Sequence, residues 1–316
     1  MRRMVRALDL ASGELLDRVY ELMAVCHAEA HPEAPMRSRA EVEAFLRHPA
    51  QFDTRESWTA ESDGDCIGFA LLGAAGSASP TARVELLVHP HSRRAGRGSA
   101  LLETVRSRAT ALGAGVLIGG HSTEAGSRFA AAMGATDKHR EVESLLRLPL
   151  AVALDPVPGY RLRSWIGAAP EELLDSFARA REAINDAPSA ADEELAVWDA
   201  ERVRALEESL ERRDRDLRVT VALDEAGEVV AFTELRLART PGATAGTEDT
   251  AVVREHRRKG LGRLVKSESL RRLQLDRPDV TQLTTVNAEE NRAMRALNEA
   301  LGFRPIAVWT TCVLET

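Results

Sequence analysis

The stretch RRKGLG, residues 257–262, lies between TEDTAVV, a run typical of a strand, and RLVKSESLRRLQL, a run typical of a helix. A second stretch, RRAGRG at residues 93–98, also follows a strand-like run, RVELLV, and precedes a helix-like run, SALLETVRSRATAL. The corresponding arginines and glycines of the two stretches are 164 positions apart. The chain is therefore expected to contain a duplicated unit.

The elements expected around each stretch occur in the same order in both halves. Residues 5–148 are predicted to form a strand, two helices, three strands, and then helix, strand, helix and strand. Residues 160–315 repeat that series, so the fold expected is mixed α/β in two copies. Ser12 and Ser38 are predicted to cap helices. Helices of the second copy are expected over residues 170–185, 191–213 and 288–301.

Length and a proline-bounded segment predict where the copies divide. A chain of 316 residues exceeds the usual size of one hydrophobic core. The segment PLAVALDPVPG, residues 149–159, is poor in helix signals and is interpreted as a linker. We therefore expect a first domain over 1–149, a linker over 150–159 and a second domain over 160–316.

The composition, with 44% hydrophobic and 29% charged residues, is typical of a soluble globular protein. No run approaches the ~18 apolar residues of a membrane span, and the N-terminus lacks a signal-peptide core. Cys26, Cys66 and Cys312 have neither metal-ligand nor disulfide spacing. We expect a cytoplasmic protein without a metal site or a membrane partner.

The net charge and its distribution along the chain indicate which kinds of partner the protein can bind. A net charge of −7 disfavours nucleic acid, because binding that polyanion needs a basic surface. Residues 171–216 hold 15 acidic residues against 7 arginines, an excess that would attract a cationic amine. Two amphipathic helices with solvated acidic faces are the alternative explanation. Within this segment AINDAPSAADEE, residues 183–194, could form a loop over an acceptor site.

A strand that ends in a glycine-rich turn leading into a helix is a potential anion site. The unpaired amides of the first helical turn and the helix dipole both favour negative charge there. Gly260 and Gly262 would let the backbone approach a ligand, and Arg257 to Lys259 add positive charge. A single copy would be a weak signal, equally explained by a surface turn. Two copies in matching contexts favour pyrophosphate binding.

Both copies resemble the R/Q-x-x-G-x-G/A loop of the GNAT superfamily of acetyl-CoA-dependent N-acetyltransferases. VNAEENRAMRALNEALGF, residues 286–303, resembles that superfamily's closing pattern, with an asparagine at a strand end, another opening a helix, and a terminal Gly-Phe. The resemblance covers essentially the whole chain and implies a tandem GNAT protein. VELLVHPHSRRAGRG and the duplicated layout are similar to actinobacterial mycothiol synthase, whereas the second half resembles other tandem acetyltransferases, so no acceptor is implied.

The resemblance implies acetyl-CoA as cofactor and assigns residues to it. Backbone amides of Val252, Val253 and Arg254 would contact the pantetheine arm and polarise the thioester carbonyl. Amides around Arg258 to Arg263 would hold the pyrophosphate. The implied cofactor-binding residues are Val252, Val253, Arg254, Arg257, Arg258, Lys259, Gly260, Leu261, Gly262, Arg263, Asn287, Asn291 and Asn298, with Val88, Arg93, Arg94, Gly96, Arg97, Gly98 and Ser99 in the first half.

Glu248 and Asp249 are the candidate catalytic residues. An acceptor amine must lose a proton, which a carboxylate can take directly or through water. The pair precedes the loop where glucosamine 6-phosphate N-acetyltransferases also carry Glu-Asp. In an extended strand neighbouring side chains point to opposite faces, so one of the two is expected to face the site. We favour Glu248, with a structural or solvated carboxylate as the alternative.

Asn291 and Asn298, seven residues apart, are expected on one face of a helix, where Asn291 could contact the cofactor arm or cap the helix. Many GNAT enzymes carry, at the position of Asn298, a tyrosine that protonates the leaving thiolate. The first half has Ala130 there, and the only tyrosines, Tyr20 and Tyr160, are far from the motif in sequence. Thiolate protonation would then come from water or another group.

The second half is expected to be catalytic. The first half has an intact loop but only Glu85 on the matching strand, and GGHSTEAGSRF replaces the asparagine pair. His121 could act as a base there or be a packing residue. The predicted function is acetyl transfer to a primary amine of a small polar or cationic metabolite in a ternary complex. A CoA-binding protein without turnover and a protein or peptide acetyltransferase are the alternatives, and either a monomer or a homodimer is expected.

Overall fold

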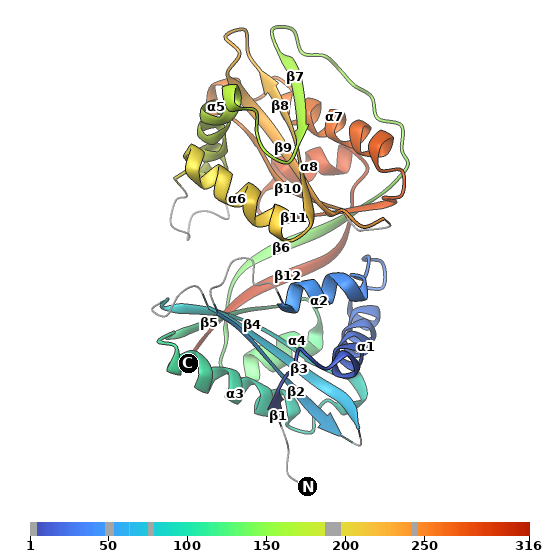
Figure 1. The fold of residues 1–316 in the computed structure, drawn as a ribbon, viewed down its shortest axis with the longest axis vertical. Helices are drawn as coiled ribbons and strands as arrows, with labels where there is room; N and C mark the ends of the chain where they lie inside the picture. The colour runs from blue at the N-terminus through green and yellow to red at the C-terminus, as the bar shows by residue number, and fades with distance from the viewer. Residues whose placement is uncertain (1–4, 48–53, 63, 75–78, 187–196, 242–244) are drawn as a thin grey trace. The chain divides into compact units, whose positions relative to one another are not determined.

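The computed structural model describes residues 5–47, 54–62, 64–74, 79–186, 197–241 and 245–316. The chain divides into two compact units. Unit 1 comprises Met1–Glu141 and Ala307–Thr316, and unit 2 comprises Val142–Ile306. Each unit has a sheet with helices on both faces (Figure 1). In the part of the chain that the structure describes, no helix is long and apolar enough to cross a membrane.

The sheet of unit 1 is antiparallel except for one parallel pair, β4 with β5. Its strands lie in the order β1 (Val5–Ala7), β2 (Thr54–Ser62), β3 (Asp65–Ala74), β4 (Thr81–Val88), β5 (Val116–His121) and β12 (Arg304–Glu315). Its helices are α1 (Gly13–Ala30), α2 (Arg39–Arg47), α3 (Arg97–Ala111) and α4 (Glu124–Ala132). Phe69 and Leu71 of β3 pack with α1 and α2, whereas Ala70 and Leu72 pack with α3, because alternate strand residues face opposite sides.

Unit 2 repeats this arrangement. Its strands lie in the order β6 (Thr136–Arg147), β11 (Gln282–Ala288), β10 (Ala245–Val252), β9 (Val229–Ala238), β8 (Arg215–Leu223) and β7 (Arg161–Ile166). Its helices are α5 (Glu171–Arg181), α6 (Ala200–Arg212), α7 (Leu261–Asp276) and α8 (Arg292–Ala300). Phe232 of β9 packs against the core under α5 and α6, and Ala231 packs against α7 on the other face. Figure 1 shows α5 and α6 on one face of this sheet and α7 and α8 on the other.

The last strand of each half contributes to both units. Residues from Val142 onward in β6 belong to unit 2, where Leu146 and Leu148 join the core around Phe303. Conversely, Thr310–Glu315 of β12 pair with β5 in unit 1. β6 and β12 have 12 residues each, or roughly 40 Å of extended chain. The compact units are therefore bounded differently from the continuous segments 1–149 and 160–316.

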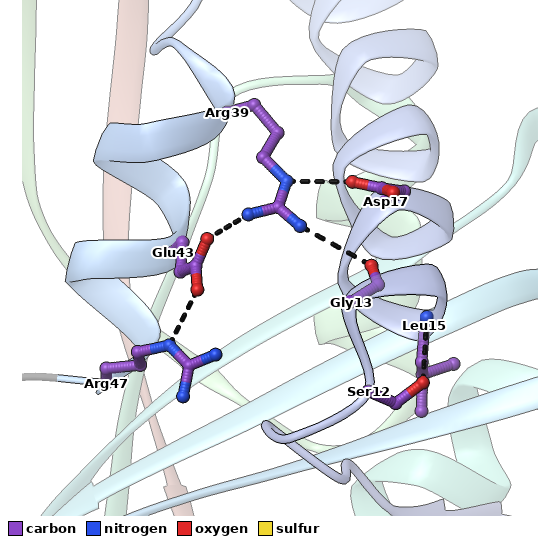
Figure 2. Close-up of polar contacts among 7 residues, drawn as sticks. All are labelled: Ser12, Gly13, Leu15, Asp17, Arg39, Glu43 and Arg47. Carbon is purple, nitrogen blue, oxygen red and sulfur yellow. Dashed lines mark hydrogen bonds and ion pairs between the residues drawn. The ribbon is translucent and has the colours of Figure 1, made fainter.

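Capping residues define the starts of the first two helices. Ser12 Oγ accepts a hydrogen bond from Leu15 N at 3.2 Å (Figure 2). Ser38 Oγ accepts from Glu41 N at 3.3 Å, while Glu41 Oε2 accepts from Ser38 N at 2.9 Å, which completes a capping box. Both predicted caps are confirmed.

An arginine joins these helices to each other. Figure 2 shows Arg39 of α2 donating to Asp17 Oδ1 at 2.8 Å and to the carbonyl of Gly13, both in α1. Arg39 also pairs with Glu43 of its own helix, which in turn accepts from Arg47 at 2.8 Å. The network fixes α2 against the N-terminal turns of α1.

Three predicted helices in unit 2 differ in extent from those observed. The helix predicted over 170–185 is α5 followed by a 3-10 turn, η2 (Glu182–Asp186). Of the helix predicted over 191–213, residues 191–196 lie outside the described residues, and α6 begins after Asp199, whose carboxylate caps it by accepting from Arg202 N at 2.7 Å. Ala288, predicted to be helical, ends β11 instead. The acceptor loop predicted over 183–194 lies largely outside the described residues.

Lys266 of α7 is buried in the core of unit 2, with its ammonium nitrogen 5.6 Å from the centre of the Phe303 ring. Burial lowers the pKa of Lys266 from 10.5 to about 7. A buried amine with so low a pKa is largely uncharged in mildly basic solution, which makes the stability of the fold depend on pH.

The unfolded chain keeps a proton on this lysine between about pH 7 and about pH 10.5, where the folded chain has lost it. Stability should therefore rise with pH across this window. Lys266→Met should remove this rise and increase the free energy of unfolding near neutral pH by at least ~1 kcal/mol. Urea denaturation of wild type, Lys266→Met and Lys138→Met, an exposed control, measures this. Parallel pH profiles for all three proteins would contradict it.

Candidate active site

In both units the parallel strand pair separates after three residue pairs. β10 and β11 pair from Ala245 with Leu283 to Thr247 with Thr285, and no further register follows. β4 and β5 pair from Thr81 with Val116 to Arg83 with Ile118 and then also separate. Beyond these points the N–H and C=O groups that face the gap between the two strands are not paired across it, so a ligand could bond to them.

The loop after each separated strand has the same backbone conformation. A 3-10 turn, η4 (Arg254–His256), leads to Arg258 and Gly260, whose φ angles are 62° and 86°. In unit 1 a 3-10 turn, η1 (Pro90–Ser92), leads to Arg94 and Gly96, with φ angles of 62° and 73°. Left-handed residues at both positions turn successive amides toward one side, as in anion-binding nests. The predicted duplication thus extends to backbone geometry.

The helix that follows each loop begins with unpaired donors. Gly260 and Gly96 occupy the N-cap positions of α7 and α3, and neither helix start has a side-chain cap. The amides of Leu261, Gly262 and Arg263 have no intrahelical acceptor, because the first turn lies before the ladder begins. Together with the helix dipole, these amides fit a pyrophosphate.

Strand geometry decides which of the preceding amides can reach a cofactor. Val253 N donates to Val230 O at 2.9 Å, and His89 N donates to Ile67 O at 2.9 Å in unit 1. Since strand amides point alternately to the two sides, those of Val252 and Val88 point toward the gap. The amide of Val253 donates within the sheet, so of the two valine amides the one of Val252 is the better placed for the cofactor arm.

The first arginine of each loop stabilises the turn. Arg257 Nε donates to Val252 O at 2.9 Å, and Arg93 Nε donates to Val88 O at 3.2 Å. Arg257 and Arg254 both pair with Asp186 of η2, whereas Arg93 pairs with Glu29 of α1. The positive charge that Arg257 was predicted to add for phosphate binding is therefore largely neutralised by the carboxylate of Asp186.

The last glycine of each loop is required by helix packing. A Cβ at Gly98 would lie 3.0 Å from the Phe129 ring of α4, and one at Gly262 would lie 3.3 Å from Leu297 of α8. We expected Gly262 to let the backbone approach a ligand. The structure gives a further reason for a glycine there, which is its close packing against α8. Ser99, which follows Gly98, contacts Met133 Sδ through its hydroxyl at 3.8 Å.

Tyr160 lies beside the loop although it is far from it in sequence. Its hydroxyl is 2.9 Å from His256 Nδ1 and accepts from Lys259 Nζ at 3.0 Å. Arg263 Nη2 lies 3.7 Å from Asp155 Oδ2. Asp155, in the predicted linker, and Tyr160, just before β7, therefore both lie beside the second loop. Tyr160 is thus near the loop in space although far from it in sequence, and it does not replace the tyrosine absent from α8.

A bulge in β10 changes the orientation expected for the two carboxylates. The register with β9 shifts between Thr247 and Thr250, so Glu248 and Asp249 both lie opposite a single residue. Asp249 Oδ2 accepts from Arg181 Nη2 at 3.2 Å, and Glu248 Oε2 is 3.5 Å from Arg236 Nη1. Both carboxylates therefore reach one arginine cluster, and the expectation that they face opposite sides of the sheet is wrong.

The asparagines of α8 are engaged in local contacts. Asn291 Oδ1 accepts from Met294 N at 3.2 Å, which identifies it as the helix cap, one of the two roles considered. Asn298 is buried, and its amide donates to Asn287 Oδ1 at 2.7 Å. The helix position where many relatives have an acidic hydroxyl thus holds a neutral amide pair.

Unit 1 lacks the features that carry side-chain chemistry in unit 2. The register between β3 and β4 has no shift, and Glu85 is exposed. His121 Nε2 is 3.1 Å from Asp137 Oδ1, and Ser122 Oγ is 2.9 Å from His31 Nε2. The loop is conserved in geometry between the two units, but the bulge with its two carboxylates is confined to unit 2 within the described strands.

The sequence profile of the acetyltransferase (GNAT) family matches residues 16–133 and again residues 177–303. The two matches span more than half of the chain, and the chain belongs to this family. Within the family it is a tandem protein, as the two loops predict.

Two curated relatives carry the name mycothiol acetyltransferase. The protein of Amycolatopsis mediterranei is 28% identical over 170 residues, which cover 52% of this chain and 52% of that relative. The protein of Salinispora tropica is 29% identical over 258 residues, covering 77% of this chain and 76% of the relative. The chain therefore spans about half the length of the former.

Solved structures support the same architecture. A tandem GNAT protein from the clavulanic acid biosynthesis pathway, without AcCoA, is similar with a TM-score of 0.82 and 28% identity over 99% of this chain and 98% of that one. A GCN5-related N-acetyltransferase from Sphaerobacter thermophilus has a TM-score of 0.74 at 18% identity, over 99% of this chain and 95% of that one, a likeness that concerns the fold alone.

Substitution of the packing glycines tests their role. Gly98→Ala should destabilise unit 1 by ~1–3 kcal/mol, because its Cβ meets a rigid aromatic ring. Gly262→Ala should cost less, since Leu297 can rotate. Adding Phe129→Leu to Gly98→Ala should restore part of the lost stability. Thermal denaturation of the three variants measures this, and an unchanged Tm for Gly98→Ala would refute the packing role.

Proposed function

We propose that the protein is an N-acetyltransferase that moves the acetyl group of acetyl-CoA to a primary amine within a ternary complex in unit 2. The acceptor is a small polar or cationic metabolite, such as an antibiotic, aminosugar or amino-acid derivative. One observation carries this proposal: β10 combines the separation from β11, the bulge with Glu248 and Asp249, and the anion loop at its end.

Acetyl-CoA, when bound, supplies an activated acetyl thioester. The amides of Arg258 to Arg263 would hold its pyrophosphate, and the amide of Val252 would orient the arm and polarise the carbonyl. A preorganised backbone donor favours the charge that develops on the carbonyl oxygen during acyl transfer. Arg257 contributes by holding the turn, through its bond to Val252 O.

Glu248 is the proposed base. The acceptor nitrogen forms the new C–N bond while the C–S bond breaks, and the sulfur leaves with the electron pair. Glu248 takes the proton of the amine directly or through water. The departing thiolate takes a proton from water, and a thiol with an ordinary pKa of ~8.5 is a sufficiently good leaving group for this. The buried amide of Asn298 supplies no acidic proton for that step.

Several carboxylates of the acidic segment of unit 2 are paired with arginines. Glu171 and Glu207 share Arg204, and Glu211 and Asp216 share Arg239. Each guanidinium offsets one of its two partners' charges, so part of the negative charge of the segment remains. We assign the attraction of a cationic amine to the carboxylates of the bulge together with this remaining charge.

The two loops can be separated by calorimetry. Gly260→Asp places a carboxylate in the proposed pyrophosphate site and should abolish binding of acetyl-CoA to unit 2 together with turnover. Gly96→Asp should leave turnover intact and remove binding to unit 1, if that unit binds the cofactor. Isothermal titration of both variants, with thiol release assayed against a panel of amines, measures this. Stoichiometric binding without turnover of any amine would favour a CoA-binding protein instead.

The base assignment is tested by Glu248→Gln. Without the carboxylate, kcat/KM should fall by at least ~10²-fold. Glu255→Gln, an exposed glutamate in η4, serves as control and should behave like wild type. A rate and pH profile unchanged in Glu248→Gln would show that another group takes the proton.

A further inference from the structure

Beneath the bulge lies a cluster of charged residues centred on Arg181 of α5. Arg181 and Glu234 of β9 are 1% and 0% exposed and form an ion pair. Arg181 also donates to Asp249 at 3.2 Å, and its guanidinium carbon lies 3.8 Å from the centre of the Trp198 ring. Arg181 is thus held by two carboxylates and an aromatic face at once.

Arg236, two residues beyond Glu234 in β9, extends the cluster. Its guanidinium is 3.6 Å from Glu234 Oε2 and 3.5 Å from Glu248 Oε2, both too long for good hydrogen bonds. Glu234 Oε2 is completely buried and accepts no hydrogen bond from the described residues. Buried polar atoms normally have a partner, so this unmet capacity marks the cluster as incomplete.

The cluster carries an uncompensated negative charge. Glu234, Glu248 and Asp249 supply three carboxylates against the guanidiniums of Arg181 and Arg236. Arg202 adds a positive charge nearby, over the Trp198 ring, but it is exposed to solvent. The accessible members are Asp249 and Glu248, whose side chains are 36% and 39% exposed. The excess charge is therefore presented at the two carboxylates of the bulge.

Unit 1 provides an internal comparison. Its counterpart of β9 is β3, and residues 66–74 of that strand, CIGFALLGA, contain no charged side chain. The register between β3 and β4 has no shift, so the bulge and the charged pair of β9 occur together in unit 2 and have no counterpart in β3 and β4. A purely structural ion pair would not explain why the charges accompany the bulge.

We infer that this cluster is the acceptor site, that it takes a small primary amine as its ammonium ion, and that Arg181 is a positioning residue for it. This inference rests on the function proposed above. Arg181 and Glu234 hold Asp249 in place, with one of its oxygens occupied, so that Asp249 binds the ammonium group. Glu248, whose Oε2 lies 3.5 Å from Arg236 Nη1, is left to accept the proton. The ammonium charge neutralises the cluster.

Kinetics of Arg181→Met and Arg181→Lys test this, with Arg179→Met as matched control. Arg179 lies on the same helix, is exposed and pairs with Glu228. Arg181→Met should raise KM for the amine at least about tenfold, because Asp249 loses the guanidinium that orients it toward the ammonium group, and should shift the pH profile of kcat/KM. Arg181→Lys should restore part of the loss. Affinity for acetyl-CoA should not change in any variant.

A folded Arg181→Met protein with wild-type KM for the amine and an unchanged pH profile would overturn the inference. If Arg181→Met does not fold, Asp249→Asn replaces it, since this exposed carboxylate should show the same rise in KM. Direct titration of cadaverine and glucosamine into the protein with acetyl-CoA separates the two proposals. Binding that weakens in Asp249→Asn, without turnover in wild type, would leave the ammonium site standing and refute the acetyl transfer. No binding of either amine to wild type would refute the ammonium site.

Discussion

The bulge in β10 is the constraint on which the site of unit 2 depends. An ordinary strand would direct Glu248 and Asp249 to opposite faces of the sheet, and only one of them could take part in chemistry. The extra residue turns both toward Arg181 and Arg236, at the point where β10 also parts from β11. One local irregularity thus brings together a gap for a cofactor, a pair of carboxylates and the arginines that hold them.

The two units share the loop features that depend on the backbone and differ in the features that depend on particular side chains. Both loops have left-handed residues at matching positions, an arginine bonded to the last strand carbonyl, and a glycine against the next helix. These features depend on backbone amides and packing, so they tolerate extensive change elsewhere. The charged cluster, which depends on particular side chains, is found in the described residues of unit 2 and not in β3 or β4. Anion binding and acceptor chemistry can therefore diverge independently in a duplicated fold.

Much of the fold could be predicted from the sequence, because the hydrophobic period, the serine caps and the duplicated loops are local signals. The division of β6 and β12 between the two compact units could not, because it depends on contacts between elements far apart in sequence. For the site, the conformation of the loop was accessible from motif spacing, whereas the role of Glu248 stays a prediction. Arg181, Arg236 and Tyr160 were missed because they come from elements distant in sequence. A lone Glu234 within the apolar run VVAFTELRLA was the one available signal, as a buried charge needs a partner.

Acetyl transfer in unit 2 is tested most directly by a crystal structure of the protein soaked with acetyl-CoA. We expect the pyrophosphate at the amides of Arg258 to Arg263, the arm beside Val252, and the acetyl group within reach of Glu248. Density for the cofactor in unit 1 alone, with the loop of unit 2 free of it at saturating concentration, would refute acetyl transfer in unit 2.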